Sequence, residues 1–263
     1  MSALDELFAR CRAEGRAALI GYLPVGYPSV AESVEAMVAM VEAGVDAVEV
    51  GVPYTDPGMD GPVIQVAVDA ALRGGSRVKD VFTAVRAVAD SGAVAVTMGY
   101  WNPVEKYGPA RWAADLKAAG GSGCITPDLI PEEAGAWVEA AREQDLDPVF
   151  LVAPSSTDER IAVVGRTNRG FVYATAVMGV TGARAEIGSR AKELVGRVRA
   201  QTDLPVCVGL GVSDGDQAAE VAAFADGVIV GSALVAALRD GGVEAVRALS
   251  ADLVAGVRRR PAA

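Results

Sequence analysis

Residues 47–52 read Ala47-Val48-Glu49-Val50-Gly51-Val52, an apolar run that contains one carboxylate. Such a short run, rich in β-branched residues, predicts a parallel strand that is buried on both faces. Burial of an unpaired carboxylate is unfavourable, so Glu49 either has a partner, such as an arginine or backbone amides, or has a raised pKa. A carboxyl group that titrates near neutral pH can act as a general acid and base, which makes Glu49 a candidate catalytic residue.

A turn-rich loop follows this strand and carries a second carboxylate, Asp60. Its sequence is Pro53-Tyr54-Thr55-Asp56-Pro57-Gly58-Met59-Asp60-Gly61-Pro62. Asp before Gly is also common in simple turns, because Asp tolerates the left-handed region and hydrogen-bonds its own backbone. A glutamate at a strand end followed by an aspartate on the next loop nevertheless suggests an active site, with Asp60 the more hydrated of the two.

Eight short apolar runs alternate with helical patterns along the chain. The predicted strands are residues 17–23, 47–52, 93–100, 123–127, 148–153, 170–176, 205–209 and 227–230. Helices are predicted at residues 3–14, 30–43, 78–89, 110–119, 131–143, 157–167, 189–200, 217–223, 233–238 and 243–257. Eight strand–helix units in about 250 residues are typical of a (β/α)8 or TIM barrel, here with an extra N-terminal helix. No linker-like segment divides residues 1–263, so we expect a single domain. A doubly wound sheet is disfavoured, because Gly21-Tyr22-Leu23-Pro24 lacks the glycine pattern of that fold.

The chain is acidic, with 24 Lys and Arg against 34 Asp and Glu and a net charge of −10. That charge repels nucleic acids and anionic membranes, so neither is an expected partner. Residues 1–7 lack the basic and apolar pattern of a signal peptide, and the apolar stretch 227–238 is too short to span a bilayer. We therefore expect a cytoplasmic protein. Its three cysteines are far apart, without metal-ligand spacing.

Two absences narrow the chemistry. The chain has no histidine, which excludes histidine-based triads and the usual zinc sites. Its four lysines fall in predicted helices or loops, so no strand offers a Schiff-base lysine: Lys79, Lys106, Lys117 and Lys192. Carbon–carbon cleavage or isomerisation would have to use carboxylates. A magnesium ion held by Glu49, Asp56 and Asp60 is the alternative.

Glycine-containing loops follow three consecutive predicted strands. They are Gly179-Val180-Thr181-Gly182, Gly209-Leu210-Gly211-Val212-Ser213 and Gly231-Ser232-Ala233. Glycines let backbone amides approach a ligand closely, and we expect Ser232 to cap the short helix 233–238. Barrels often bind phosphate at the loops after strands seven and eight, so the pattern predicts a phosphate site.

Residues 49–65 resemble the signature of the tryptophan synthase alpha subunit family, the indole-3-glycerol-phosphate lyases. The resemblance extends over nearly the whole chain, through Gly26-Tyr27-Pro28, Tyr100-Trp101-Asn102-Pro103, Pro127-Asp128-Leu129, Tyr173 and the three glycine loops. It implies retro-aldol cleavage of indole-3-glycerol phosphate to indole and glyceraldehyde 3-phosphate in tryptophan biosynthesis. It also implies no cofactor in this chain, and a beta subunit with pyridoxal phosphate in an alpha2-beta2 heterotetramer.

The resemblance also implies roles for individual residues, position by position. Glu49 and Asp60 match the catalytic carboxylates, and Thr181 is expected to hydrogen-bond Asp60 when the loops close. Asp128 matches the rim that faces the indole pocket or the partner. Substrate-binding positions are matched by Tyr22, Ile64, Tyr100, Tyr173 and Thr181, and phosphate-binding positions by Gly182, Gly211, Gly231 and Ser232.

The chain departs from the family pattern at Gly99, at Ala176-Val177-Met178 and at Asp128-Leu129-Ile130-Pro131, which bear on loop dynamics and partner fit. Three other functions remain open. A phosphoribosyl isomerase would need an acidic residue on the first strand, and residues 17–23 contain none. The others are a free-standing lyase that releases indole, and an inactive scaffold that only activates a beta subunit.

Overall fold

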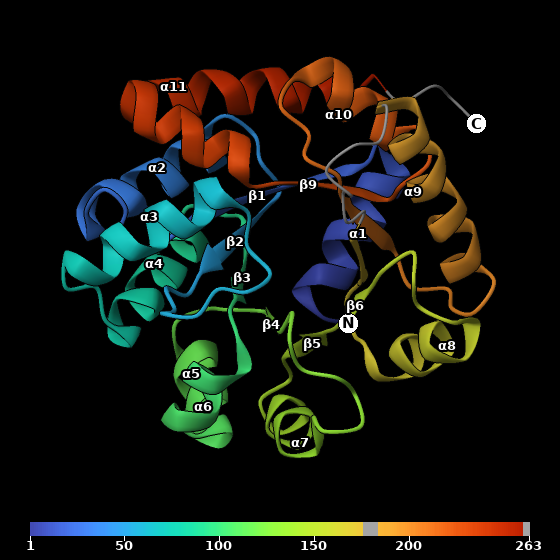
Figure 1. Cartoon of the computed structure of the whole chain (residues 1–263), viewed down its shortest axis with the longest axis horizontal. Coiled ribbons are helices and arrows are strands. Elements are labelled where there is room, and N and C mark those ends of the chain that lie inside the picture. Colours follow the sequence, from blue (N-terminus) through green and yellow to red (C-terminus); the bar gives the residue numbers. More distant parts are fainter. Residues whose placement is uncertain (176–183, 260–263) are drawn as a thin grey trace.

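The computed structural model describes residues 1–175 and 184–259. Within these ranges nine parallel strands form one sheet, in the order β5-β4-β3-β2-β1-β9-β8-β7-β6. Because β5 and β6 are consecutive pieces of one segment, the two edges of the sheet meet and the strands close into a barrel inside a ring of helices (Figure 1). The strands are β1 (Ala18–Pro24), β2 (Ala47–Gly51), β3 (Val94–Met98), β4 (Gly123–Ile125), β5 (Asp147–Val149), β6 (Leu151–Val152), β7 (Val172–Thr175), β8 (Val206–Gly209) and β9 (Gly227–Val230).

The predicted fifth strand, residues 148–153, is divided at Phe150. At this point the side chain of Asn168, and not a neighbouring strand, makes hydrogen bonds with the backbone of Phe150. Its Oδ1 accepts a hydrogen bond from the Phe150 N–H (3.0 Å), and its Nδ2 donates to the Phe150 carbonyl (3.1 Å) and to the Phe171 carbonyl (2.9 Å). The buried backbone is thus satisfied where the strand leaves the ladder. The (β/α)8 barrel with an extra N-terminal helix is confirmed, although its fifth strand is assigned in two pieces.

Helices cover the outside of the barrel. In the described part of the chain they are α1 (Ala3–Ala13), α2 (Val30–Glu42), α3 (Pro62–Arg73), α4 (Val78–Asp90), α5 (Trp101–Tyr107), α6 (Pro109–Ala118), α7 (Gly135–Glu143), α8 (Asp158–Thr167), α9 (Arg184–Arg199), α10 (Gly215–Ala222) and α11 (Ser232–Val257). The predicted helices 233–238 and 243–257 are the two halves of α11, which is kinked at Gly242 (φ 66°). None of the described helices is long and apolar enough to cross a bilayer.

The sequence patterns do not predict α3 or α5. Helix α3 begins at Pro62, directly after Gly61, and buries Ala67, Val68 and Ala71 against the barrel. A proline at the first helical position is a known start signal, because its fixed φ suits a helix and its missing N–H has no partner there anyway. In the sequence, Pro62 reads as the end of the turn that contains Asp60. The helix matters for function, since it starts immediately after Asp60.

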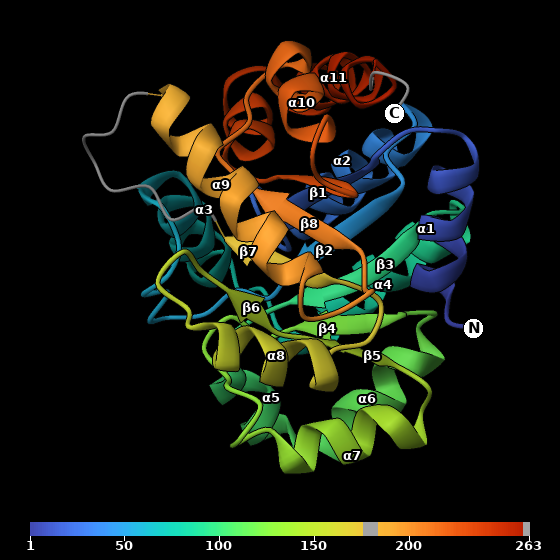
Figure 2. The same cartoon turned by 90° about the vertical axis from the view of Figure 1, so that its right-hand side faces the viewer.

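Two apolar layers hold the fold together. The larger lies between the strands and the outer helices. The smaller fills the barrel interior and the end of the barrel at which the strands begin. Helix α1 closes that end, with Leu4, Leu7 and Phe8 packed against residues near the starts of several strands. Figure 2 shows α1 at one edge of the barrel. The opposite end, formed by the carboxyl ends of the strands, is therefore the end left for a functional site.

Candidate active site

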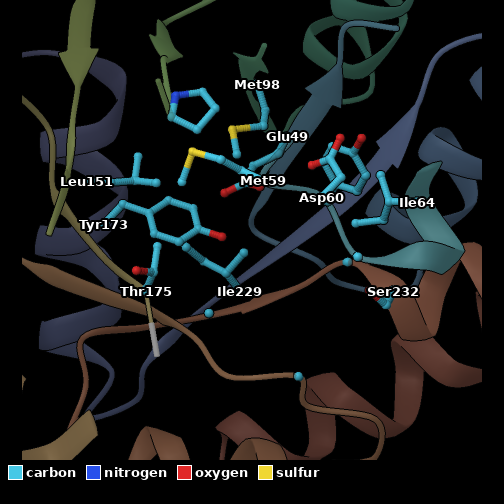
Figure 3. A pocket seen from close by; sticks show the side chains of 16 residues that line it. Glu49, Met59, Asp60, Ile64, Met98, Leu151, Tyr173, Thr175, Ile229 and Ser232 are labelled. Atoms are coloured by element: carbon cyan, nitrogen blue, oxygen red, sulfur yellow. The ribbon is translucent and has the colours of Figure 1, made fainter. Parts of the chain in front are cut away.

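A cavity of about 400 Å³ lies at the carboxyl ends of the strands. Figure 3 shows its labelled side chains converging from different strands and loops. Its lining includes eight of the predicted site residues, which are Tyr22, Glu49, Asp60, Ile64, Tyr173, Gly211, Gly231 and Ser232. Tyr100 is not part of the lining, and Thr181 and Gly182 lie outside the described residues.

Glu49 is the buried carboxylate of this cavity. It lies on β2 opposite Tyr22 of β1, and the residue is 1% exposed. Its Oε1 has no hydrogen-bond partner. Burial without compensation disfavours the charged form and raises the pKa of Glu49 from 4.5 to about 8. Near neutral pH the residue is therefore protonated and able to donate a proton.

Asp60 is the second carboxylate, and it reaches the cavity from the loop between β2 and α3. Hydrogen bonds hold this loop: the Asp60 N–H donates to the Pro57 carbonyl (3.2 Å), and the Gln65 amide donates to the Asp60 carbonyl (2.8 Å). Burial raises the pKa of Asp60 from 3.8 to about 6, while a hydrogen bond from Tyr100 opposes this rise. Asp60 is thus ionised at a pH where Glu49 keeps its proton.

Tyr100 supports Asp60 from behind the cavity wall. It is 6% exposed, and its hydroxyl oxygen accepts a hydrogen bond from the Met59 N–H (2.9 Å). Its ring packs beside Tyr54, with centroids 5.2 Å apart. Tyr100 therefore connects the loop that carries Asp60 to the start of α5. The resemblance implies that Tyr100 binds the substrate. In the structure Tyr100 does not line the cavity, and it contacts the loop that carries Asp60.

Glycines and a helix start form the side of the cavity away from Glu49. Gly211 has a left-handed φ of 67°, which favours glycine, and Gly231 precedes α11. Our expectation that Ser232 caps this helix is wrong: the cap is Gly231, and Ser232 is the first helical residue. Because Gly231 has no side chain to cap the helix, the amide groups of the first turn remain available to a ligand.

The cavity also contains residues that the sequence analysis did not single out. They are Met59, Gly61, Met98, Pro127, Leu151, Thr175, Gly209 and Ile229. Most are strand or strand-end residues that look like ordinary core positions in the sequence. Only their place at the carboxyl ends of strands could have indicated the site. The Thr175 hydroxyl is already engaged, since it donates to the Val152 carbonyl (3.2 Å).

The magnesium alternative receives no support from the geometry. Asp56 is exposed, accepts a hydrogen bond from Thr55 (2.6 Å) and is not part of the cavity lining. Among the side chains of residues 1–175 and 188–259, no group of three or more Cys, Asp or Glu is arranged to hold a metal ion. None of the four lysines lies on a strand, as predicted, and all four lie on helices: Lys79, Lys106, Lys117 and Lys192.

Comparison with known proteins agrees with this geometry. The sequence profile described as tryptophan synthase alpha chain matches residues 8–256. The chain belongs to this family. The tryptophan synthase alpha chain of Mycobacterium intracellulare is 61% identical over 262 residues, which are 100% of this chain and 97% of the relative.

Solved structures extend the likeness to the fold. A chain of Mycobacterium tuberculosis tryptophan synthase has a TM-score of 0.93 and 60% identity, and 98% of each chain is covered. Tryptophan synthase subunit alpha from Legionella pneumophila has a TM-score of 0.89 at 30% identity, again with 98% of each chain covered. The resemblance predicted from residues 49–65 is therefore confirmed. As a family member, the chain is a lyase of tryptophan biosynthesis that cleaves indole-3-glycerol phosphate.

Proposed function

We propose that Glu49 is the proton shuttle and Asp60 the fixed anion in the cleavage of indole-3-glycerol phosphate to indole and glyceraldehyde 3-phosphate. One observation carries the assignment: the two carboxylates share a cavity, and burial raises the pKa of Glu49 to about 8 and that of Asp60 only to about 6. Two titratable groups whose surroundings separate their pKa values are typical of an acid–base pair.

The reaction needs both charge states. Indole is a poor leaving group until C3 of its ring accepts a proton, and protonated Glu49 can supply it. Ionised Asp60 stabilises the positive charge that then develops at the ring N–H. The bond from C3 to the glycerol carbon breaks, its electrons return to the ring, and the neighbouring glycerol hydroxyl loses its proton to become the aldehyde. Glu49, now ionised, can accept that proton, which restores its starting state.

The substrate's phosphate would lie at Gly211, Gly231 and Ser232, with Gly182 from the loop after β7. Among the residues whose side chains the structure describes, no lysine or arginine lines the cavity, so we assign the phosphate to the backbone amides of these loops. The indole ring would then lie among the apolar side chains on the carboxylate side. Those predicted from the sequence are Tyr22, Ile64 and Tyr173; we add Met98, Leu151 and Ile229, which line the same cavity.

The same proposal covers partner, cofactor, domain and location. The chain pairs with a beta subunit, in an alpha2-beta2 heterotetramer, and pyridoxal phosphate is needed only by that subunit. Carboxylate catalysis requires no cofactor in this chain. We further propose that residues 1–263 form one domain and that the protein is cytoplasmic. The rim around Asp128, whose Oδ1 accepts a hydrogen bond from the Trp101 N–H (2.8 Å), is the proposed docking face.

The test is to incubate the purified chain with indole-3-glycerol phosphate and measure indole, with and without a beta subunit. We expect slow release by the chain alone and faster release by the complex. Equal, rapid release in both would identify a free-standing lyase. No release in either, from a folded chain, would contradict the proposal and leave the scaffold function.

A further inference from the structure

Tyr22 lines the cavity, and its ring occupies a slot, the space left free by the missing side chains of Gly51 and Gly231. A Cβ built on Gly51 of β2 would lie 2.7 Å from the Tyr22 hydroxyl oxygen, and a Cβ built on Gly231 would lie 3.4 Å from Cδ1 of the ring. The root of the ring is therefore next to Gly231, and its hydroxyl is over the end of β2. The ring spans the distance from the proposed phosphate site to the two carboxylates.

The slot depends on the strand register. Tyr22 is opposite Glu49, and Gly51 lies two residues further along β2 on the same face. Because any side chain at position 51 would collide with the ring, glycine there allows the hydroxyl to reach β2. The loop that carries Asp60 begins directly after this strand.

The Tyr22 hydroxyl lies over the end of β2, the strand that leads into the loop carrying Asp60, and both residues line the same cavity. The described lining contains four side-chain hydroxyls, those of Tyr22, Tyr173, Thr175 and Ser232. Thr175 is engaged with the Val152 carbonyl, and Ser232 is at the start of α11. Burial raises the pKa of both tyrosines; after burial, the carboxylate that raises it most is Asp60 for Tyr22 and Glu49 for Tyr173.

We propose that the Tyr22 hydroxyl is a positioning group that donates a hydrogen bond to the Asp60 carboxylate when substrate fills the cavity, and so holds that carboxylate ionised beside the indole N–H. This inference rests on the proposed function. An ionised carboxylate offers about four acceptor positions, so Tyr22 does not compete with Tyr100 or with the expected contact from Thr181. A ring that only formed the cavity wall would not need its hydroxyl.

The test is Tyr22→Phe, measured as kcat and KM for indole release by the complex with beta subunit between about pH 5 and pH 9. The titratable groups that interact with Asp60 are Tyr22, Tyr100 and Tyr173, and Glu49 lines the same cavity; only Tyr22 is changed. Loss of a hydrogen bond to a charged group should lower kcat about tenfold, leave KM nearly unchanged, and move the acidic limb of the kcat profile up by about one pH unit.

The matched control is Tyr107→Phe. It removes a hydroxyl that bonds Asp115 between α5 and α6, outside the cavity, and should leave rate and profile unchanged. A Tyr22→Phe enzyme with wild-type kcat and profile would overturn the inference, and so would a rise in KM alone, which would make the hydroxyl a substrate contact. Asp60→Asn separates this failure from failure of the proposed function, because only the latter predicts an active Asp60→Asn enzyme.

Discussion

Glu49→Gln separates the catalytic role of this residue from its cost to the fold. Glutamine has nearly the same shape but cannot donate or accept the transferred proton. Each acid or base role contributes about 10²–10⁴ to a rate, so the lyase rate of the variant should fall by at least about 100-fold. The barrel should remain folded, because the side chain in the wild type already lacks a partner for Oε1.

The variant should also change how stability depends on pH. Below pH 4.5 Glu49 is protonated in both the folded and the unfolded chain. Between there and about pH 8 the unfolded chain has released the proton that the folded protein keeps, so the free energy of unfolding falls as pH rises. The slope is up to about 1.4 kcal/mol per pH unit, and the total loss is up to about 5 kcal/mol. Glu49→Gln removes this loss of stability at high pH. The cost of burying the glutamine amide is the same at every pH, so it does not affect the comparison.

Urea unfolding of wild type and variant at about pH 5, 7 and 9 would measure the difference. The variant should gain on the wild type by several kcal/mol between the lowest and the highest pH. Parallel pH dependence in the two proteins would show that Glu49 does not titrate in this range. A variant that released indole at nearly the wild-type rate would refute the proton shuttle.

Three further predictions concern the whole site. The wild-type kcat/KM should be bell-shaped in pH, with an acidic limb near pH 6 from Asp60 and a basic limb near pH 8 from Glu49. Asp60→Asn should lower the rate by about 100-fold or more and abolish the acidic limb. A wild-type profile that is flat from pH 5 to 9 would contradict the assignment. Gly231→Asp should raise KM by about tenfold or more, because it adds bulk and negative charge beside the proposed phosphate site. The control Gly135→Asp on α7, where a Cβ meets open space, should leave KM unchanged. Equal KM values in the two variants would show that the phosphate does not bind at the start of α11. Titration with a cognate beta subunit should increase the lyase rate by about ten- to a hundredfold by favouring the closed loops, and a flat response despite complex formation would exclude activation by the partner.

Local pattern was sufficient for most of the architecture. Apolar runs with β-branched residues and helical periodicity predict the barrel strands and most helices, because both signals come from residues close in sequence. Some elements differ from the prediction. Helix α3 is not predicted because Pro62 reads as the end of a turn, and the strand at 148–153 is divided at Phe150, whose backbone bonds the side chain of Asn168, 18 residues further along the chain.

The sequence by itself determined which chemistry is available: two carboxylates near the end of one strand, glycines at three strand ends, no histidine, and no lysine on a strand. Tertiary structure alone decided what these groups can do. The pKa of Glu49 rises to about 8 because segments from several strands exclude water from it, and the Tyr22 hydroxyl reaches β2 because Gly51 and Gly231, 180 positions apart, leave room for the ring. Desolvation and close approach arise from contacts between residues far apart in the chain, so no local pattern in the sequence can specify them.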